Sequence, residues 1–292
     1  MGIYAVTGSA SGMGRAAAEK LRAGGHVVIG VDRVHAEVVA DLSCAQGRQT
    51  AAHEVLTAAG GVLDGAVLAA GLGPGGSGPD RLESLVQVNF LGVTELLTAW
   101  HPALACADGA KVVVFSSNST TTVPLVPARA VRALLHDDAD KAVRAVRMYG
   151  RHAPVMAYAA TKIAVTRWVR RHAVRPDWAG AGIRLNALAP GAVMTPLLQE
   201  QLSSGAQAAM VRAFPVPTGG YGDAGQLADW ALFMLSDAAD FLCGSVVVVD
   251  GGTDAYFRAD DWPRPVPAHE LLRYFLRYRS SRTSLSDERL PA

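Results

Sequence analysis

Short, continuously apolar runs rich in β-branched residues alternate along this chain with longer alanine-rich stretches. An apolar run without polar alternation suits a parallel strand that is covered on both faces. Strands that alternate with helices build a doubly wound sheet with right-handed crossovers. The pattern therefore predicts an α/β fold with about seven parallel strands between two layers of helices. The predicted strands are residues 3–6, 27–31, 38–39, 65–69, 111–115, 183–188 and 245–249.

Two segments fall outside this alternation. Residues 118–155 contain apolar positions at helical spacing, and they predict an inserted pair of helices with a charged outer face. Residues 253–292 predict a C-terminal extension that contains several prolines and the stretch RYFLRYRSSR. Between residues 1 and 252 there is no internal repeat and no linker, so this range predicts a single domain.

The charge balance limits the partners that we expect. The 27 Lys and Arg residues face 26 Asp and Glu residues, which argues against a nucleic-acid binder that relies on bulk positive charge. The arginines and aromatic residues of 273–282 could bind nucleic acid or a membrane surface. Acidic residues elsewhere in the tail nearly cancel that charge, so we favour a helix that packs on its own chain or on a partner subunit. They include Asp260, Asp261, Glu270, Asp287 and Glu288.

The three cysteines, Cys44, Cys106 and Cys243, are far apart and form no CxxC pair. They predict small buried thiols in a reduced, cytoplasmic chain, and neither a disulfide framework nor a zinc site. The first apolar run lacks the basic start of a signal peptide. No run approaches the roughly 20 apolar residues of a membrane span, so we expect no membrane association. The eight histidines show no metal-ligand pattern, and we expect no catalytic metal.

A glycine-rich segment, VTGSASGMG at residues 6–14, follows the first predicted strand and precedes the first helix. Gly8 allows a tight turn, Gly12 lets the backbone approach a pyrophosphate, and Gly14 permits close packing of helix and sheet. The helix N-terminus then offers unpaired N–H groups and a partial positive charge to phosphates. Glycines also mark ordinary turns, but between a strand and a helix this segment indicates a Rossmann-type dinucleotide site.

Asp32 stands at the carboxyl end of the second predicted strand. A carboxylate there can accept hydrogen bonds from a ribose 2′-hydroxyl and would repel a 2′-phosphate. The alternatives are a surface aspartate that opens a turn, or a phosphate site favoured by the neighbouring Arg33. We give Asp32 more weight and predict NAD(H), in preference to NADP, as the cofactor.

The segment MAYAATKIAV, residues 156–165, places Tyr158 and Lys162 one turn apart on the same face of an otherwise apolar helix. A free tyrosine has a pKa of about 10, which is too high for a good base near neutrality. Lowering that pKa by two or three units requires roughly 3–4 kcal/mol. One ammonium about 4 Å away supplies about 4 kcal/mol at an effective dielectric near 20. The pair therefore predicts a general acid/base, against the alternative of a helix-surface contact without function.

These features occur together with further motifs in a fixed order, and through all of them the chain resembles the short-chain dehydrogenase/reductase family from residue 3 to about 252. The motifs are TGSASGMG, DL (41–42), LAAG (68–71), VNFLG (88–92), VVVFSS (112–117), YAATK (158–162), RLNALAPGAVMTP (184–196) and VVVVDGG (246–252). The family's usual Asn-Asn-Ala-Gly is replaced by Leu68-Ala69-Ala70-Gly71. The side-chain hydrogen bonds of those asparagines are therefore absent from this chain.

The resemblance implies that Tyr158 is the general acid/base, with Lys162 beside it, while a hydride passes between the nicotinamide and the substrate carbon. Ser117, in preference to Ser116, would hydrogen-bond the substrate oxygen, and Asn89 would help to hold a proton-relay water. The resemblance also implies a set of cofactor contacts along the glycine turn, the adenine and the nicotinamide. They are Gly8, Ser11, Gly12, Met13, Gly14, Asp32, Arg33, Asp41, Leu42, Ala70, Gly71, Tyr158, Lys162, Pro190, Gly191, Val193 and Thr195.

The long insertion between Ser117 and Tyr158, together with AGLGPGG and VNFLGVTELL, resembles the bacterial 3α-hydroxysteroid dehydrogenase/carbonyl reductase branch of the family. The implied substrates are bulky apolar secondary alcohols and ketones, steroids among them. We expect residues 195–217 to fold over the substrate, although an ordinary amphipathic lid helix would show the same apolar positions. These positions are Leu197, Leu198, Met210, Val211 and Phe214.

In many relatives the helix that carries the catalytic tyrosine packs against a second subunit, and here the insertion lies directly before that helix. We therefore expect a homodimer through another face, near the last strand. Two other functions stay open. One is an enzyme of the same fold that performs a redox-neutral step such as epimerisation or cyclisation. The other is a non-catalytic dinucleotide-binding scaffold, which is disfavoured because the tyrosine, lysine and serine positions are all kept.

Overall fold

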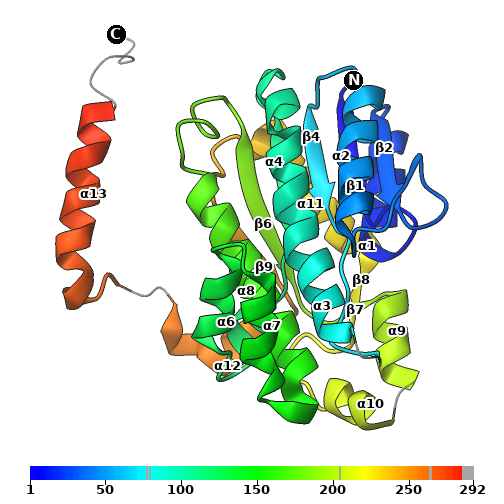
Figure 1. The fold of residues 1–292 in the computed structure, drawn as a ribbon, viewed down its shortest axis with the longest axis vertical. Helices are drawn as coiled ribbons and strands as arrows, with labels where there is room; N and C mark the ends of the chain where they lie inside the picture. The colour runs from blue at the N-terminus through cyan, green and yellow to red at the C-terminus, as the bar shows by residue number, and fades with distance from the viewer. Residues whose placement is uncertain (77, 79, 204, 263–264, 285–292) are drawn as a thin grey trace. The chain divides into compact units, whose positions relative to one another are not determined.

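The structure is a computed structural model that describes residues 1–76, 78, 80–203, 205–262 and 265–284. The chain divides into two compact units, Met1–Tyr256 and Phe257–Ala292. The sheet and the candidate site belong to the first unit (Figure 1). The sequence placed the end of this domain at residue 252, close to the boundary between the two units.

A seven-stranded parallel sheet forms the centre of the first unit, in the order β3-β2-β1-β4-β5-β6-β9. The sheet confirms the predicted α/β, doubly wound fold. Its strands are β1 (Ile3–Thr7), β2 (Val27–Asp32), β3 (Val38–Val39), β4 (Gly65–Leu68), β5 (Lys111–Phe115), β6 (Arg184–Pro190) and β9 (Val246–Val249). A small two-stranded sheet pairs β7 (Val193–Met194) with β8 (Gly222–Asp223), and no sequence pattern predicted it.

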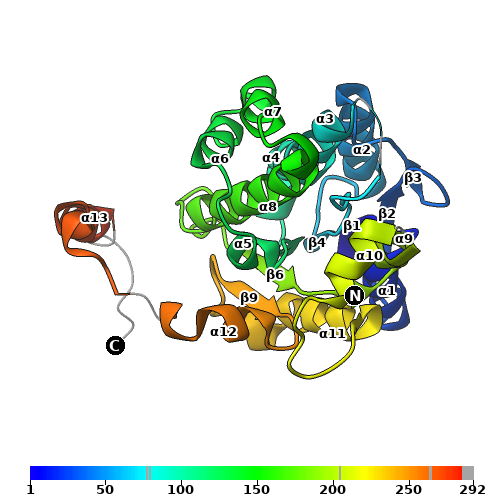
Figure 2. The same ribbon diagram turned by 90° about the horizontal axis from the view of Figure 1, so that it is seen from below.

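Helices cover both faces of the large sheet, as Figure 2 shows. On one face lie α2 (Ala45–Ala58), α4 (Gly92–Ala105) and α8 (Ala153–His172), and on the other lie α1 (Gly12–Ala23) and α11 (Ala224–Leu235). Successive residues of a strand therefore enter opposite cores. Val112 belongs to the cluster under α4 and α8, whereas Val113 belongs to the cluster under α1 and α11. Burial on both sides explains why the strand sequences are apolar without alternation.

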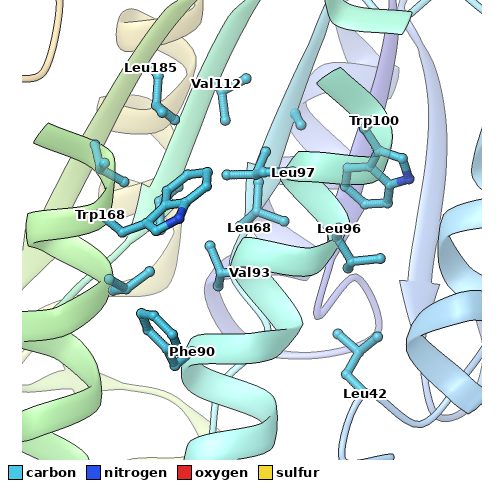
Figure 3. Close-up of a cluster of buried hydrophobic side chains, with 14 of the residues drawn as sticks. Leu42, Leu68, Phe90, Val93, Leu96, Leu97, Trp100, Val112, Trp168 and Leu185 are labelled. Atoms are coloured by element: carbon cyan, nitrogen blue, oxygen red, sulfur yellow. The ribbon is translucent and has the colours of Figure 1, made fainter. Parts of the chain in front are cut away.

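The larger core lies between the sheet and the helices α4 and α8. Figure 3 shows Leu68, Val112 and Leu185 of three neighbouring strands next to Leu97 of α4 and Trp168 of α8. Each such side chain contributes about 1.5–3 kcal/mol on burial. This packing holds α8, and with it the predicted catalytic pair, against the sheet.

The insertion forms α5 (Ser119–Thr122), α6 (Ala128–Leu134), α7 (Ala139–Arg147) and the short 3-10 turn η2 (Gly150–His152). Helices α6 and α7 are the pair that the apolar spacing predicts, and both pack against α8 (Figure 2). Val131, Leu134, Val143 and Val146 are buried on their inner faces, while the arginines of α7 are exposed. The insertion therefore covers part of the outer surface of α8.

Near the carboxyl edge of the sheet, α3 (Arg81–Val86) continues into a turn of π-helix, η1 (Gln87–Leu91), and then into α4. Two lid helices, α9 (Pro196–Ser203) and α10 (Gly205–Arg212), follow β7. After β8, a capping box between Asp223 and Gln226 starts α11. The remaining short helices are η3 (Asp237–Ala239), α12 (Thr253–Arg258) and η4 (Ala259–Asp261).

The second unit begins within α12, and its described part contains η4, η5 (Ala268–Glu270) and α13 (Leu271–Ser284), in agreement with a helix in the tail. Asp287 and Glu288 lie outside the described residues. The cysteines are free, but Cys44 and Cys106 are exposed, so the expectation of buried thiols was wrong for these two. Their neighbours are turn and helix-end positions at the surface. No helix within the described ranges is long and apolar enough to cross a membrane.

Candidate active site

The predicted site residues gather where the central strands end, which is the usual binding edge of an open parallel sheet. The glycine turn follows β1, and the segment Ala69–Gly71 follows β4. Ser117 comes after β5, and Pro190 ends β6. Four separate stretches of the chain are thus brought to one edge by the strand order alone.

The glycine turn adopts a conformation that other residues would disturb. Gly8 has a φ of 72°, and a Cβ there would lie 2.9 Å from the backbone nitrogen of Ala70. A Cβ on Gly14 would lie 2.2 Å from the carbonyl oxygen of Gly8, so only glycine permits this approach of helix and strand. Across from the turn, Thr195 Cγ2 stands 3.4 Å from the Cβ position of Gly12. The turn and Thr195 form two walls of a narrow cleft.

This cleft holds a cavity of about 320 Å³, which we call the cofactor cavity. Most of the predicted cofactor contacts line it, namely Gly8, Ser11, Gly12, Met13, Gly14, Asp32, Arg33, Asp41, Leu42, Ala70, Gly71 and Thr195. Pro190 and Gly191 are not among the described residues that line it, and Val193 lines a different cavity. A glycine cradle at a helix N-terminus with a carboxylate beyond it fits a dinucleotide.

Asp32 ends β2, and its carboxylate organises the far side of the cavity. Oδ2 accepts a hydrogen bond from the backbone N–H of Ala10, at 3.0 Å, and Oδ1 accepts one from the N–H of Arg33, at 2.7 Å. The carboxylate thus braces the glycine turn and still borders the cavity. The Arg33 residue is exposed at the same end.

Tyr158 lies in α8 with Ala157, Ala159 and Ala160 buried around it, and its hydroxyl is hydrogen-bonded by the side chain of Ser117. The neighbouring Ser116 points elsewhere, because its Oγ pairs with Thr166 Oγ1 at 2.6 Å. Of the two serines, the structure therefore brings Ser117 to the tyrosine. Burial raises the pKa of Tyr158, and the hydrogen bond from Ser117 only partly opposes that rise.

The expected effect of Lys162 on Tyr158 was wrong for the chain without a bound cofactor. Lys162 is buried, and its Nζ donates to the carbonyl oxygen of Phe115 at 2.8 Å. Burial lowers the pKa of Lys162 to about 8, and Lys162 is not a cause of any lowering of the pKa of Tyr158. The expectation used the attraction between the Lys162 ammonium and the Tyr158 phenolate at an effective dielectric near 20, which applies to partly solvated groups. In a dry pocket the cost of desolvation exceeds the attraction between them.

Asn89 lies fully buried in the π-helical turn η1, a feature often found at functional sites. Its side chain clamps the backbone of Leu72: Oδ1 accepts from the N–H at 2.8 Å, and Nδ2 donates to the carbonyl at 2.9 Å. A Cβ on Gly71 would lie 3.4 Å from Asn89 Oδ1 and 3.7 Å from Lys162 Nζ. Because Gly71 also lines the cofactor cavity, this glycine joins the cavity to the predicted catalytic residues.

Several residues at this edge escaped the sequence analysis. Thr7 Oγ1 accepts a hydrogen bond from the N–H of Ala70 at 3.1 Å, and so holds the segment whose asparagines are missing. Its position directly before Gly8 was a signal that could have found it. Other cavity-lining residues had no such signal, because they come from the loop after β4, from α3, from η1 and from the first residue of the lid. They include Leu72, Arg81, Ser84, Val88 and Pro196.

The second cavity, of about 750 Å³, lies along α11 and the end of β9. Val193, Trp230, Phe233 and Val249 line it, and among its described lining residues there is none of the four predicted catalytic residues. Within the described residues, no group of three or more His, Cys, Asp or Glu side chains could hold a metal ion.

Comparison with known proteins gives the family. Residues 140–254 match the family model described as Enoyl-(Acyl carrier protein) reductase. The 3-alpha-hydroxysteroid dehydrogenase/carbonyl reductase of Comamonas testosteroni is 38% identical over 258 residues, which cover 88% of this chain and 98% of that protein. The chain belongs to the short-chain dehydrogenase/reductase family. It is an oxidoreductase of this family, related to the hydroxysteroid dehydrogenases.

Solved structures agree with this assignment. The 3-alpha-hydroxysteroid dehydrogenase of Pseudomonas sp. B-0831, crystallised in complex with NADH, superposes with a TM-score of 0.82 at 41% identity, covering 88% of this chain and 99% of that one. An aldohexose dehydrogenase from Thermoplasma acidophilum has the same fold, with a TM-score of 0.67, 21% identity and coverage of 91% and 97% of the two chains.

Proposed function

We propose that this protein is an NAD(H)-dependent oxidoreductase that interconverts a bulky, apolar secondary alcohol and its ketone. The observation that carries the proposal is the convergence of Tyr158, Ser117 and Lys162 beside a glycine-lined cofactor cavity. The hydroxysteroid dehydrogenase relatives, one of them in complex with NADH, support the same reaction class.

In this proposal the Tyr158 phenolate oxygen takes the hydroxyl proton of the alcohol, while Ser117 donates a hydrogen bond to the same substrate oxygen. A bound oxidised nicotinamide would supply the acceptor for the hydride of the substrate carbon and a positive charge near the phenol. Lys162, whose Nζ lies near Gly71 of the cofactor cavity, would hold the ribose of that group. Asn89 fixes the loop after β4 through Leu72. Reduction of the ketone reverses each transfer.

The apolar character of the proposed substrate rests on the lid and on the relatives. Leu197 of lid helix α9 lines the cofactor cavity, and the next residue of the same helix, Leu198, is buried. Val211 and Phe214 are partly buried near α10, and the side chain of Met210 lies outside the described residues. The steroid substrates in the names of the relatives match a lid with this composition.

A panel of secondary alcohols, including 3α-hydroxysteroids and small cyclic alcohols, tests the proposal when it is run with NAD and NADP in parallel. We expect NADH to form in proportion to ketone, with higher kcat/KM for the bulky apolar substrates. Turnover of substrate without NADH formation would instead identify a redox-neutral enzyme. Dinucleotide binding without turnover of any member would indicate a binding scaffold.

Cofactor choice gives a prediction for Asp32. Asp32→Asn keeps an acceptor for the N–H of Ala10 but removes the negative charge. A like charge about 4 Å from a 2′-phosphate costs about 1–4 kcal/mol, depending on the local dielectric. We therefore expect the ratio of kcat/KM for NADP to that for NAD to rise by about tenfold. Asp41→Asn, at the other wall of the cavity, is the matched control and should leave the ratio unchanged. An unchanged ratio in Asp32→Asn would remove Asp32 from cofactor selection.

We propose a homodimer through α11 and β9. Strand β9 is an edge of the sheet, and its Val248 is 41% exposed; Trp230 and Phe233 of α11 are 42% and 44% exposed. Because a buried unpaired carboxylate costs several kcal/mol, Phe233→Asp is expected to convert the dimer into chains of 30.5 kDa. Sedimentation measures the mass, and Leu125→Asp, on the exposed surface of the insertion, is the control. A tetramer, or a dimer that survives Phe233→Asp, would contradict this assembly.

A further inference from the structure

Arg81 is the first residue of α3 and lines the cofactor cavity. Its Nη2 donates a hydrogen bond to the carbonyl oxygen of Gly73. Its Nε is buried and has no hydrogen-bond partner in the part of the chain that the structure describes. A buried donor without a partner is costly, and an ionised one more so. An arginine in this state at the wall of a ligand cavity points to a ligand that accepts hydrogen bonds.

The position of Arg81 follows from a series of contacts across the cleft. Thr195 approaches Gly12 of the glycine turn, and Leu197, two residues further on, approaches the loop after β4. The Cβ position of Gly73 is 3.0 Å from Leu197 Cδ1, and Gly73 is the residue to which Arg81 is bound. Arg81 therefore stands on the lid side of the cavity, and the glycine turn forms the opposite side.

The charges around the cavity favour an anion at this place. Among the described residues that line it, Arg33 and Arg81 are the cations, and Asp32 and Asp41 are the anions. Arg33 lies beside Asp32 at the end of β2, so its charge acts at the end of the cavity where we expect the ribose of the dinucleotide. The diphosphate of a dinucleotide carries about two negative charges, and at the glycine turn the helix α1 offers only a partial positive charge. Arg81 is the cation that the lid side supplies.

We propose that Arg81 binds the diphosphate of the dinucleotide from the lid side, opposite the glycine turn. This inference rests on the proposed function and adds a cofactor-binding residue to it. A planar guanidinium can donate from two of its nitrogens to two phosphate oxygens at once. The Nη2 bond to Gly73 fixes the plane of the group at the wall of the cofactor cavity.

Burial supports this reading of Arg81. It lowers the pKa of the guanidinium, and the exposed carboxylate of Glu200 in α9 opposes that change. Glu200 is thus an anionic group that acts on Arg81, and it comes from the lid. A bound diphosphate would supply a second and stronger anionic partner, which would also tie the lid to α3.

The test compares ligands with and without the diphosphate. The affinities of the full-length chain for NADH, ADP-ribose and adenosine are measured, the first by fluorescence and the others by competition. Arg81→Met is expected to weaken NADH and ADP-ribose by about 10- to 100-fold, the range for a hydrogen bond to a charged group, and to leave adenosine unchanged. Arg81→Lys, which keeps the charge but loses the fork, is expected to show a smaller loss for the same two ligands.

Two controls separate ligand binding from support of the lid. Glu200→Gln removes the internal partner and is expected to leave NADH affinity unchanged or to raise it. Unchanged NADH affinity in Arg81→Met would overturn the inference while the proposed function stands. An equal loss for adenosine, or a loss in Glu200→Gln that matches Arg81→Met, would also overturn it, because either result would show that Arg81 only braces the lid. If the unmodified chain binds neither NADH nor ADP-ribose, the proposed function falls together with the inference.

Discussion

Tyr158→Phe is expected to lower kcat by about 10²- to 10⁴-fold, the contribution of a positioned general acid/base. The variant keeps the aromatic ring that packs in α8 and loses only the hydroxyl that Ser117 meets. The described lining of the cofactor cavity does not include Tyr158, so the dissociation constant of NADH should change little. Steady-state kinetics and a fluorescence titration with NADH measure the two quantities on the same preparation.

Tyr149→Phe is a matched control, because Tyr149 is a partly buried tyrosine of the insertion and is not among the described residues that line either cavity. Its kcat should equal that of the unmodified chain. Ser117→Ala should lower kcat with little change in NADH affinity, since the hydrogen bond to the substrate oxygen is made most strongly as charge develops on it. Turnover that persists in Tyr158→Phe would remove the tyrosine from the proton transfer.

The strands could be predicted from sequence because both faces of the sheet are buried. In an α/β protein a run such as KVVVF forms a strand that is buried on both faces, whichever residues its neighbouring strands and helices contain. The glycine turn was equally accessible, because Gly14 is constrained by the backbone of Gly8, which belongs to the same short segment of the sequence. The small β7–β8 sheet could not be foreseen, since each of its strands has two residues and is defined only by its partner.

The candidate site shows the same division. The sequence indicated which residue types meet at the edge of the sheet, but it did not indicate which hydrogen bonds they form. The amide of Asn89 forms its hydrogen bonds with the backbone of Leu72, and Lys162 donates one N–H to the carbonyl oxygen of Phe115. Arg81 gave no signal at all, because its role depends on how α3 faces the lid. Such choices are settled by contacts between segments that are far apart in the chain.

The energetic balance at Lys162 explains why its effect was misjudged. A lysine lowers the pKa of a neighbouring phenol only while its amine is protonated, and burial disfavours the protonated amine. The site without a cofactor therefore holds a tyrosine with a raised pKa and a lysine with a lowered pKa. The raised pKa keeps the phenol of Tyr158 protonated, whereas the lowered pKa of Lys162, about 8, still leaves its ammonium charged at pH 7. This arrangement means that the protein stores an unfavourable charge in its interior.

Lys162→Met tests that statement, and it is expected to stabilise the fold at pH 7 while it removes turnover. The pKa of Lys162 falls from 10.5 to about 8 on folding, so below pH 8 the lysine is charged in both states and the folded chain bears the cost. At about 1.4 kcal/mol per pKa unit this cost is about 3 kcal/mol, reduced by about 1 kcal/mol for the hydrogen bond to Phe115 that the variant loses. The free energy of unfolding at pH 7 should therefore rise by about 2 kcal/mol.

The pH dependence separates this cause from simple repacking. Between pH 8 and 10.5 the folded chain has released the proton and the unfolded chain still holds it, so the stability contributed by Lys162 rises with pH. The advantage of Lys162→Met over the unmodified chain should then shrink from pH 7 to pH 10, as measured by urea unfolding without cofactor. Lys141→Met, at an exposed position of α7, controls for the loss of a charge as such. A variant that is less stable at pH 7, or an advantage that does not change with pH, would show that the buried ammonium carries no such cost.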